Sequence, residues 1–170
     1  MGISWSTALE ALRIWEYTGR ARRGYFVEGL SGAQYIKEDA YVSVIQGLTK
    51  PADKIIWLAA TDPNQVWGKA LPYNTDKKFT SVPGTTVALK QGVPVAVFER
   101  KGHTLRVFDE SVIEDGTLTD ALAAFAEAFR KKNIFPASNR ITVKQYPSAA
   151  IQALTNVGFR RVMLDYELER

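Results

Sequence analysis

Hydrophobic positions near the start of the chain recur every three to four residues, which is the period of an amphipathic helix. They predict a helix over residues 7–18, and Gly19 supplies a stop at its end. Thr7 and Glu10 have the spacing of a capping box at its start. The expected helix has one buried stripe of four residues: Ala8, Ala11, Leu12 and Trp15.

A basic turn and an aromatic–aliphatic run follow this helix. Residues 20–23 read Arg-Ala-Arg-Arg, and after Gly24 the run Tyr25-Phe26-Val27 is expected to form a short strand. A helix, a basic turn and a short strand pair are how a winged-helix domain ends. A second helix is expected over residues 37–48, with four residues on one face: Tyr41, Val44, Ile45 and Leu48.

From residue 55 the pattern changes to that of strands. The run 55–59 is continuously apolar, which is typical of a buried strand. Three further strands are expected at 85–90, 93–99 and 104–108, separated by turns that contain glycine, so the segment is an antiparallel meander. Pro94 indicates that its strand lies at an edge or is bulged there.

The clearest helix is expected over residues 117–132, with an apolar stripe of four residues: Leu118, Leu122, Phe125 and Phe129. A strand at 141–146, a short helix at 148–156 and a final strand at 159–168 follow it. Together these elements predict an α+β chain. Its sheet is mainly antiparallel and barrel-like with flanking helices, and the tail of a winged helix precedes it. We expect a winged-helix remnant and linker over residues 1–35 and the barrel-like domain over 36–170.

Composition narrows the chemistry. The 170 residues carry 22 Lys and Arg against 18 Asp and Glu, a net charge of +4 that permits nucleic acid as a partner without requiring it. There is no cysteine, which excludes disulfides and cysteine zinc sites and fits a cytoplasmic location. No apolar run approaches the roughly 20 residues of a membrane span, so no membrane contact is expected. Walker-type and DExD or DExH motifs are absent, so no catalytic or metal residue is assigned.

Arg20, Arg22 and Arg23 are the main candidate contacts for phosphate, with a merely solubilising basic turn as the alternative. Trp67 follows an Asp-Pro turn and is a candidate for stacking on a base, with packing of its loop against the sheet as the alternative. A second basic segment, Arg130 to Lys132 with Arg140 and Lys144, could extend the first into one face. Trp15 and Trp57 are expected in the core, and the sequence does not assign Trp5.

Other polar residues have simpler interpretations. His103, the single histidine, lies at an expected hairpin tip. It is either a proton donor or phosphate contact, or simply an exposed loop residue. Asp62 precedes a proline and either joins a site or initiates a turn. The acidic residues of 109–115 lack EF-hand spacing and read as a solvated charge run rather than a cation site.

The segment from Arg22 to Tyr35, RRGYFVEGLSGAQY, resembles the segment that joins the winged helix to the next domain in large helicase-related (Lhr) proteins. Residues 59–64 (AATDPN), with Trp67-Gly68 and Leu71-Pro72, are similar to that family's next motif. Residues 87–96 resemble its hairpin and Gly158-Phe159-Arg160 its closing segment. The similarity runs in order over nearly the whole chain.

This resemblance implies a bacterial, ATP-dependent 3′-to-5′ DNA helicase of superfamily 2 that is linked to DNA repair. Its RecA-like motor domains would precede residue 1 and would use ATP and magnesium; this chain itself would need no cofactor. The chain would be a non-catalytic accessory domain that contacts single-stranded DNA, or an RNA–DNA hybrid, or couples it to the motor. Arg20, Arg22, Arg23 and Trp67 would make the contacts.

Two other hypotheses remain. In the first, the chain is a protein-interaction module that docks the motor domains or a repair partner, and its exposed aromatic residues serve that interface. In the second, Asp62 and His103 form a hydrolytic site, although no third group with a recognisable spacing supports them.

Overall fold

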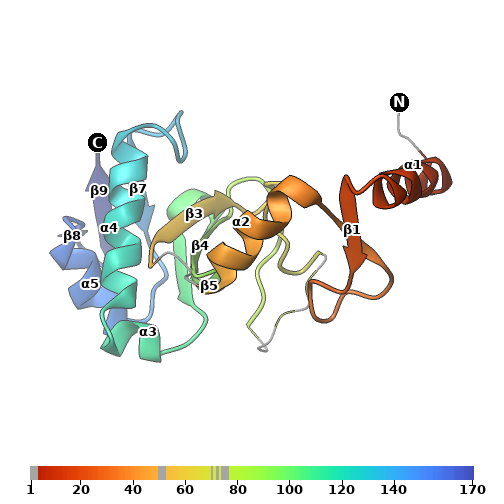
Figure 1. Ribbon diagram of the computed structural model, residues 1–170. Coiled ribbons are helices and arrows are strands. Elements are labelled where there is room, and N and C mark those ends of the chain that lie inside the picture. The colour runs from red at the N-terminus through yellow and green to blue at the C-terminus, as the bar shows by residue number, and fades with distance from the viewer. Residues whose placement is uncertain (1–3, 50–52, 70, 72, 74–76) are drawn as a thin grey trace. The chain divides into compact units, whose positions relative to one another are not determined.

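Two units divide the chain, Met1–Ala52 and Asp53–Arg170. The computed structural model describes residues 4–49, 53–69, 71, 73 and 77–170 (Figure 1). The domain boundary expected after residue 35 falls inside strand β2 (Gln34–Lys37). The residues of β2 belong to the first unit, because β2 pairs with strand β1 (Ala21–Gly24) and a helix of the same unit directly follows it.

The first unit begins with helix α1 (Trp5–Tyr17), one turn earlier than the expected capping box indicates. Ser4 is the N-cap: its backbone is extended, and its hydroxyl accepts the Thr7 N–H at 3.2 Å. Thr7 is therefore inside the helix and does not cap it, so the predicted capping box is wrong. A serine three residues before Thr7 satisfies an orphan N–H of the first turn equally well.

Strands β1 (Ala21–Gly24) and β2 pair antiparallel, and helix α2 (Glu38–Thr49) follows directly. The expected strand Tyr25-Phe26-Val27 is wrong, because the pairing ends at Gly24 and these residues lie in the connecting loop. The side chain of Gln34 organises that loop. Its carbonyl accepts the N–H groups of Phe26 and Val27, each at 2.8 Å, and its amide donates to the carbonyls of Val27 and Leu30.

Little of the first unit is buried. Among its described residues, Ala21 is the one buried hydrophobic residue. The stripe of α1 that was expected to be buried is half-buried or exposed, and Trp15 is 39% exposed. The reason is that α1 packs mainly on β1, a strand of four residues that is too short to cover a helix of 13. On α2, Tyr41 is half-buried and Val44 and Ile45 are exposed, while the side chain of Leu48 lies outside the described residues.

The second unit begins with the predicted meander. Strands β3 (Ile55–Ala59), β4 (Thr86–Lys90), β5 (Val93–Glu99) and β6 (Thr104–Val107) form one antiparallel sheet in that order. The register shifts between Ala88 and Leu89, opposite Pro94, so the predicted bulge is confirmed. Strand β3 is an edge strand with Ile56 51% exposed, which corrects the expectation of a fully buried strand.

Helix α4 (Thr117–Arg130) covers one face of this sheet through β3 and β5 (Figure 1). Its predicted stripe is confirmed, since all four residues are fully buried. Phe125 contacts Phe98 of β5 with ring centroids 4.5 Å apart, and Trp57 of β3 lies 5.1 Å from it. The Trp57 indole N–H donates to the Ala121 carbonyl at 2.7 Å, which satisfies its polar atom as it packs against the core.

A second sheet, in the order β7-β9-β8, completes the unit: β7 (Arg140–Val143), β8 (Arg160–Val162) and β9 (Asp165–Glu169). The expected single strand at 159–168 is two strands, because the backbone turns at Met163, where φ is 56°. Short helices join the elements: α3 (Ser111–Glu114), α5 (Ile151–Asn156), and the 3-10 turns η1 (Arg100–Gly102) and η2 (Ser148–Ala150).

The α+β class with antiparallel sheets is confirmed, but the described strands form no closed barrel. Strand β6 meets the segment after β7 only at its first residues: the Leu105 N–H donates to the Gln145 carbonyl at 2.8 Å. Pro147, which has no N–H to donate, follows soon after, and the chain turns into η2. None of the described helices is long and apolar enough to cross a membrane.

Candidate nucleic-acid interface

The arginines of the first unit lie on strand β1 and the turn before it, and two of them form ion pairs within the unit. Arg22 binds Glu38 of α2 in a bidentate pair, with its Nε 2.7 Å from Oε2 and its Nη2 2.7 Å from Oε1. Its guanidinium also lies 4.3 Å from the centroid of the Tyr41 ring. Arg23 pairs with Glu16 of α1 at 3.2 Å. Both arginines keep about half of their side-chain surface exposed, so further contacts are open to them.

The Arg22–Glu38 pair has an electrostatic signature in both partners. The hydrogen bonds from Arg22 lower the pKa of Glu38, and those to Glu38 raise the pKa of Arg22. Since both groups face solvent, their attraction is screened and adds little to stability. An anion at this position competes with Glu38 for the same guanidinium.

Arg20 is exposed and has no ion pair among the described residues. Its carbonyl accepts the Glu38 N–H at 3.0 Å, which fixes the turn. A cavity of about 350 Å³ lies beside it, lined by five residues: Trp15, Arg20, Lys37, Glu38 and Asp39. Arg20 is therefore the arginine of this turn whose charge is most available to a ligand.

Trp67 is half-buried in the loop between β3 and β4. Its indole N–H donates to the Gly92 carbonyl at 2.8 Å, and its ring packs against a small cluster of the second unit that includes Phe79 and Phe108. The structure thus gives Trp67 a packing role. Base stacking by its remaining exposed surface stays a prediction.

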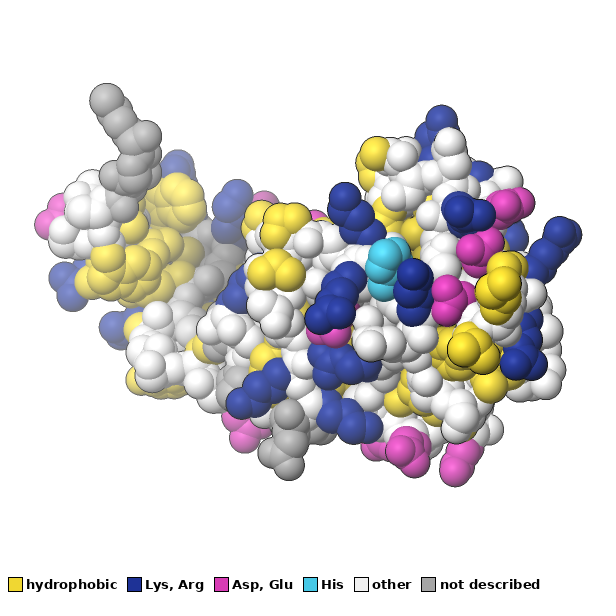
Figure 2. All heavy atoms as spheres, turned by 180° about the vertical axis from the view of Figure 1, so that it is seen from behind, with side chains coloured by type: hydrophobic (Ala, Val, Ile, Leu, Met, Phe, Trp, Pro, Cys, Tyr) yellow, Lys and Arg dark blue, Asp and Glu magenta, His cyan; other side chains and the backbone are white. Residues whose placement is uncertain are grey.

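The tip of the β5–β6 hairpin carries a second group of cations. Arg100 and Lys101 are exposed there, and the His103 carbonyl accepts the backbone N–H groups of Lys144 at 2.8 Å and Gln145 at 3.0 Å. The exposed Lys144 therefore lies directly beside the hairpin. Figure 2 shows the single histidine, in cyan, with dark-blue Lys and Arg side chains on both sides.

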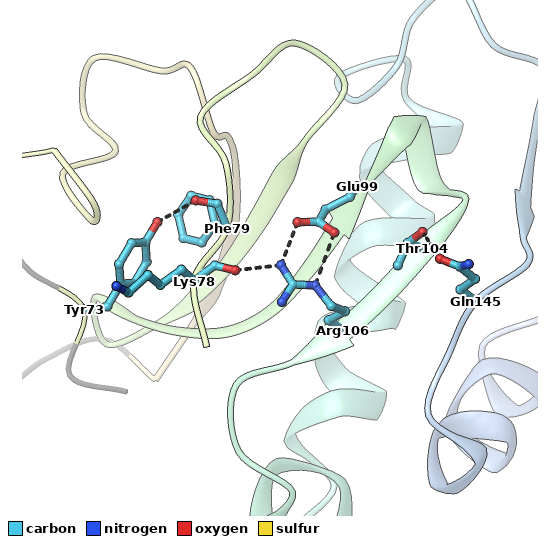
Figure 3. Close-up of polar contacts among 7 residues, drawn as sticks. All are labelled: Tyr73, Lys78, Phe79, Glu99, Thr104, Arg106 and Gln145. Carbon is cyan, nitrogen blue, oxygen red and sulfur yellow. Dashed lines mark hydrogen bonds and ion pairs between the residues drawn. The ribbon is translucent and has the colours of Figure 1, made fainter. Parts of the chain in front are cut away.

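Beside this tip a groove of about 680 Å³ runs between β6 and the segment after β7. Thr104 and Gln145 face each other across it, joined by a hydrogen bond of 3.0 Å (Figure 3). Arg106 also lines it, but its guanidinium is held by Glu99 at 2.6 Å and donates to the Lys78 carbonyl at 2.6 Å. Glu110 and Glu114 lie along the same groove.

Comparison with known proteins bears on this arrangement. The winged-helix domain of large helicase-related proteins matches residues 1–54. The Lhr helicase/probable uracil glycosylase of Mycolicibacterium smegmatis is 35% identical over 135 residues, 70% of this chain. The Lhr helicase/uracil glycosylase of Escherichia coli is 30% identical over 129 residues, 71% of this chain.

The chain belongs to the large helicase-related family. It spans 9% and 8% of the length of these two relatives. The winged-helix match covers α1 to α2, so β1 and β2, which carry or flank the three arginines, form the β-hairpin of a winged-helix domain.

Several other polar residues of this Lhr-family chain have structural roles. Asp62 accepts the Asn64 N–H at 2.8 Å, so the predicted turn is confirmed. Asp109 and Asp115 accept the N–H groups of Ser111 and Thr117, at 2.9 and 2.8 Å. No cluster of three or more metal-ligating side chains occurs in the part of the chain that the structure describes. His103 is exposed at its hairpin tip, as one of the two sequence interpretations expects.

The second basic segment lies in the second unit, whereas Arg20 to Arg23 lie in the first, so a shared basic face stays a prediction. Within it, Lys131 pairs with Glu127 at 2.6 Å and Arg140 with Glu167 at 3.3 Å. The sequence predicts the hairpin tip but not its contact with the Lys144 backbone. Two cations directly before a glycine in a hairpin were the available signal, because such turns favour Asn, Asp and Gly.

Proposed function

We propose that this chain is a non-catalytic accessory module of an ATP-dependent Lhr-family DNA helicase that contacts single-stranded nucleic acid. The observation that carries the proposal is the exposed arginine hairpin within a winged-helix domain. Lys and Arg neutralise phosphates, which supplies most of the sequence-independent affinity for nucleic acid. The names of both relatives pair a helicase with a uracil glycosylase. Enzymes of both classes act on nucleic acid.

In this proposal Arg20 contacts phosphate directly, and Arg22 and Arg23 exchange their carboxylate partners for phosphate oxygens. Bidentate geometry suits a guanidinium to both partners, so the exchange needs no large rearrangement. Trp67 is the stacking candidate of the second unit. ATP and magnesium belong, in this proposal, to motor domains that these 170 residues do not include.

The test is a titration of labelled single-stranded DNA with the chain at several salt concentrations. We expect the double variant Arg22→Gln with Arg23→Gln to weaken binding and to reduce the salt slope by about 1 for each lost contact. Glu38→Gln removes the competing carboxylate and should strengthen binding. Unchanged affinity and slope in both variants would show that these arginines do not contact the nucleic acid.

A second candidate function is protein docking, and one observation favours it. The first unit exposes a large apolar surface, and a groove of about 620 Å³ lies between its β1–β2 loop and α2. Phe26 and Tyr41, 6.2 Å apart between ring centroids, lie in it with eight other residues: Tyr25, Val27, Leu30, Gln34, Tyr35, Ile36, Val44 and Ile45. Exposed apolar patches of this kind mark interaction sites.

The proposed occupant of this groove is another part of the same helicase, because relatives have more than nine-tenths of their length outside the matched region. Val44→Asp with Ile45→Asp should then weaken association of the chain with the remainder of the helicase, added as a separate protein. DNA affinity of the isolated chain should not fall by more than the added negative charge accounts for. Unchanged association would remove the docking function.

A further inference from the structure

We propose that the tip of the β5–β6 hairpin is a second phosphate-binding surface, formed by Arg100, Lys101 and Lys144, that holds the backbone of a single-stranded nucleic acid. This inference rests on the proposed function and adds a site in the second unit. It differs from the arginine hairpin of the first unit in its elements and in its residues.

The backbone conformation of the hairpin tip supports this site. Arg100, Lys101 and Gly102 have φ angles of 52°, 57° and 95°, three successive residues in the left-handed region. Glycine and asparagine adopt this region readily, whereas long side chains with a Cβ do so at a cost. The tip therefore carries two long cations where shorter residues would fit better. Such strain persists where the side chains serve another purpose, and both cations are exposed to solvent.

The rigidity of the backbone at the tip also supports this site. The Lys101 N–H donates to the Gly84 carbonyl at 2.7 Å, and His103 is bonded to Lys144 and Gln145 through its carbonyl. Gly102 packs so closely on Ile141 that a Cβ there would lie 2.5 Å from its Cγ2. The three cations are thus attached to backbone that is fixed on both sides. A preorganised cation loses less conformational freedom when it binds an anion.

The charges of the side chains at the tip also support this site. Arg100, Lys101 and Lys144 have no side-chain ion pair among the described residues, whereas Arg106 and Arg140 are neutralised by Glu99 and Glu167. The cations of this unit are therefore of two kinds, and those at the tip belong to the kind whose charge stays available to an external anion. Figure 2 shows dark-blue Lys and Arg side chains gathered around the histidine on one face.

The groove beside the tip favours a nucleic-acid strand over an isolated phosphate as the ligand. Proteins bind single strands by combining cations for the backbone with an adjoining surface for the bases. Thr104 and Gln145 form the end of the groove next to His103 and Lys144, and the half-buried Tyr146 lies beyond them. Glu110 and Glu114, also on the groove, repel phosphates and so favour the tip for the backbone.

The test measures affinity of the whole chain for fluorescently labelled oligothymidylate. We expect Arg100→Gln with Lys101→Gln to weaken binding about tenfold at low salt and to reduce the salt slope by about 1 to 2. The control is Arg160→Gln with Lys54→Gln, two exposed cations outside the candidate segments, which removes the same charge from the same unit. It should change affinity by less than half as much on a logarithmic scale.

A second pair of variants separates binding from folding. Arg100→Asn with Lys101→Gly relieves the strained backbone, so the melting temperature should rise while DNA affinity falls. Gln91→Asn is the matched control, since Gln91 has a φ of 52° in the neighbouring β4–β5 hairpin and carries no charge. It should raise the melting temperature and leave affinity unchanged.

Wild-type affinity in both tip variants would overturn the hairpin site and leave the proposed function standing. No binding by the wild-type chain at low salt would overturn both. Equal losses in the tip variant and in the charge control would also overturn the site, because they would reflect net charge alone.

Discussion

At the scale of single residues, the arginines of this chain divide by what their side chains contact. Arg22, Arg23 and Arg106 bind carboxylates, and Arg170 binds only backbone carbonyls and a ring. Arg20 and Arg100 have neither kind of partner among the described residues. Composition counts every arginine as one positive charge, so only the fold shows which of these charges are paired.

Arg170 is an arginine with a structural role. It donates to the carbonyls of Phe129, Phe135 and Pro136, each at 3.0 Å, and its guanidinium lies 4.6 Å from the Phe129 ring centroid. We expect Arg170→Ala to destabilise the second unit by about 2 kcal/mol, because hydrogen bonds of charged groups are lost and carbonyls are left without donors.

The measurement is urea unfolding monitored by tryptophan fluorescence. Arg160→Ala, an exposed arginine on β8, is the control and should change stability by less than about 0.5 kcal/mol. A loss in Arg170→Ala no larger than that of the control would show that these bonds contribute nothing measurable.

At the scale of elements, an aspartate side chain accepts the first backbone N–H of each of the two helices that follow β6. Backbone hydrogen bonds are the main cause of the lowered pKa of Asp109 and Asp115, from Ser111 and Thr117 respectively. A pKa that is lower in the folded state contributes stability at neutral pH. That stability is lost as the pH falls through the folded-state value.

We therefore expect the wild-type chain to lose stability on acidification more steeply than Asp109→Asn with Asp115→Asn. Asparagine can still accept the N–H groups but does not titrate. Urea midpoints from neutral pH to below the usual aspartate range measure the difference. Glu110→Gln, at an N-cap whose side chain makes no capping bond, is the control and should leave the wild-type profile unchanged. Parallel profiles for the wild type and the double variant would refute this account.

The elements that sequence predicted best are those with strong periodicity and clear punctuation. Helix α4 and the meander β3 to β6 have both, and their bounds differ from expectation by two residues or fewer. The predictions failed where a single side chain or a single backbone turn decides the local structure. Gln34 bonds the backbone of Phe26 and Val27 in place of a strand, and a turn at Met163 divides the final strand.

The candidate site was predictable only in part, for a similar reason. Sequence identified Arg20, Arg22 and Arg23 as a group, but the carboxylate partners Glu38 and Glu16 come from two different helices. Likewise, Lys144 reaches the hairpin tip because the segment after β7 bonds to His103. Contacts between residues distant along the chain leave no periodic signal.

At the scale of the whole molecule, the two units differ in how much they bury. Buried hydrophobic residues are numerous in Asp53–Arg170, whereas Ala21 alone represents the described part of Met1–Ala52. Since burial supplies most of the stability of a fold, we expect the first unit to be much less stable by itself.

Hydrogen exchange followed by mass spectrometry checks this expectation. Amides of α1 should exchange orders of magnitude faster than those of α4, because local stability sets the exchange rate. Under the proposed docking function, adding the remainder of the proposed helicase as a separate protein should slow exchange in the first unit. Equal protection of α1 and α4 in the isolated chain would contradict the division.

The function that we propose for this Lhr-family chain requires that it bind single-stranded nucleic acid through phosphate contacts. Its most direct test is the affinity of the whole chain for labelled oligothymidylate as a function of salt concentration. We expect measurable binding at low salt, with the logarithm of the affinity falling linearly as the logarithm of the salt concentration rises. With at least three contacts the slope should be about −2 or steeper. Absence of binding at low salt, or affinity that does not depend on salt, would contradict the proposed function.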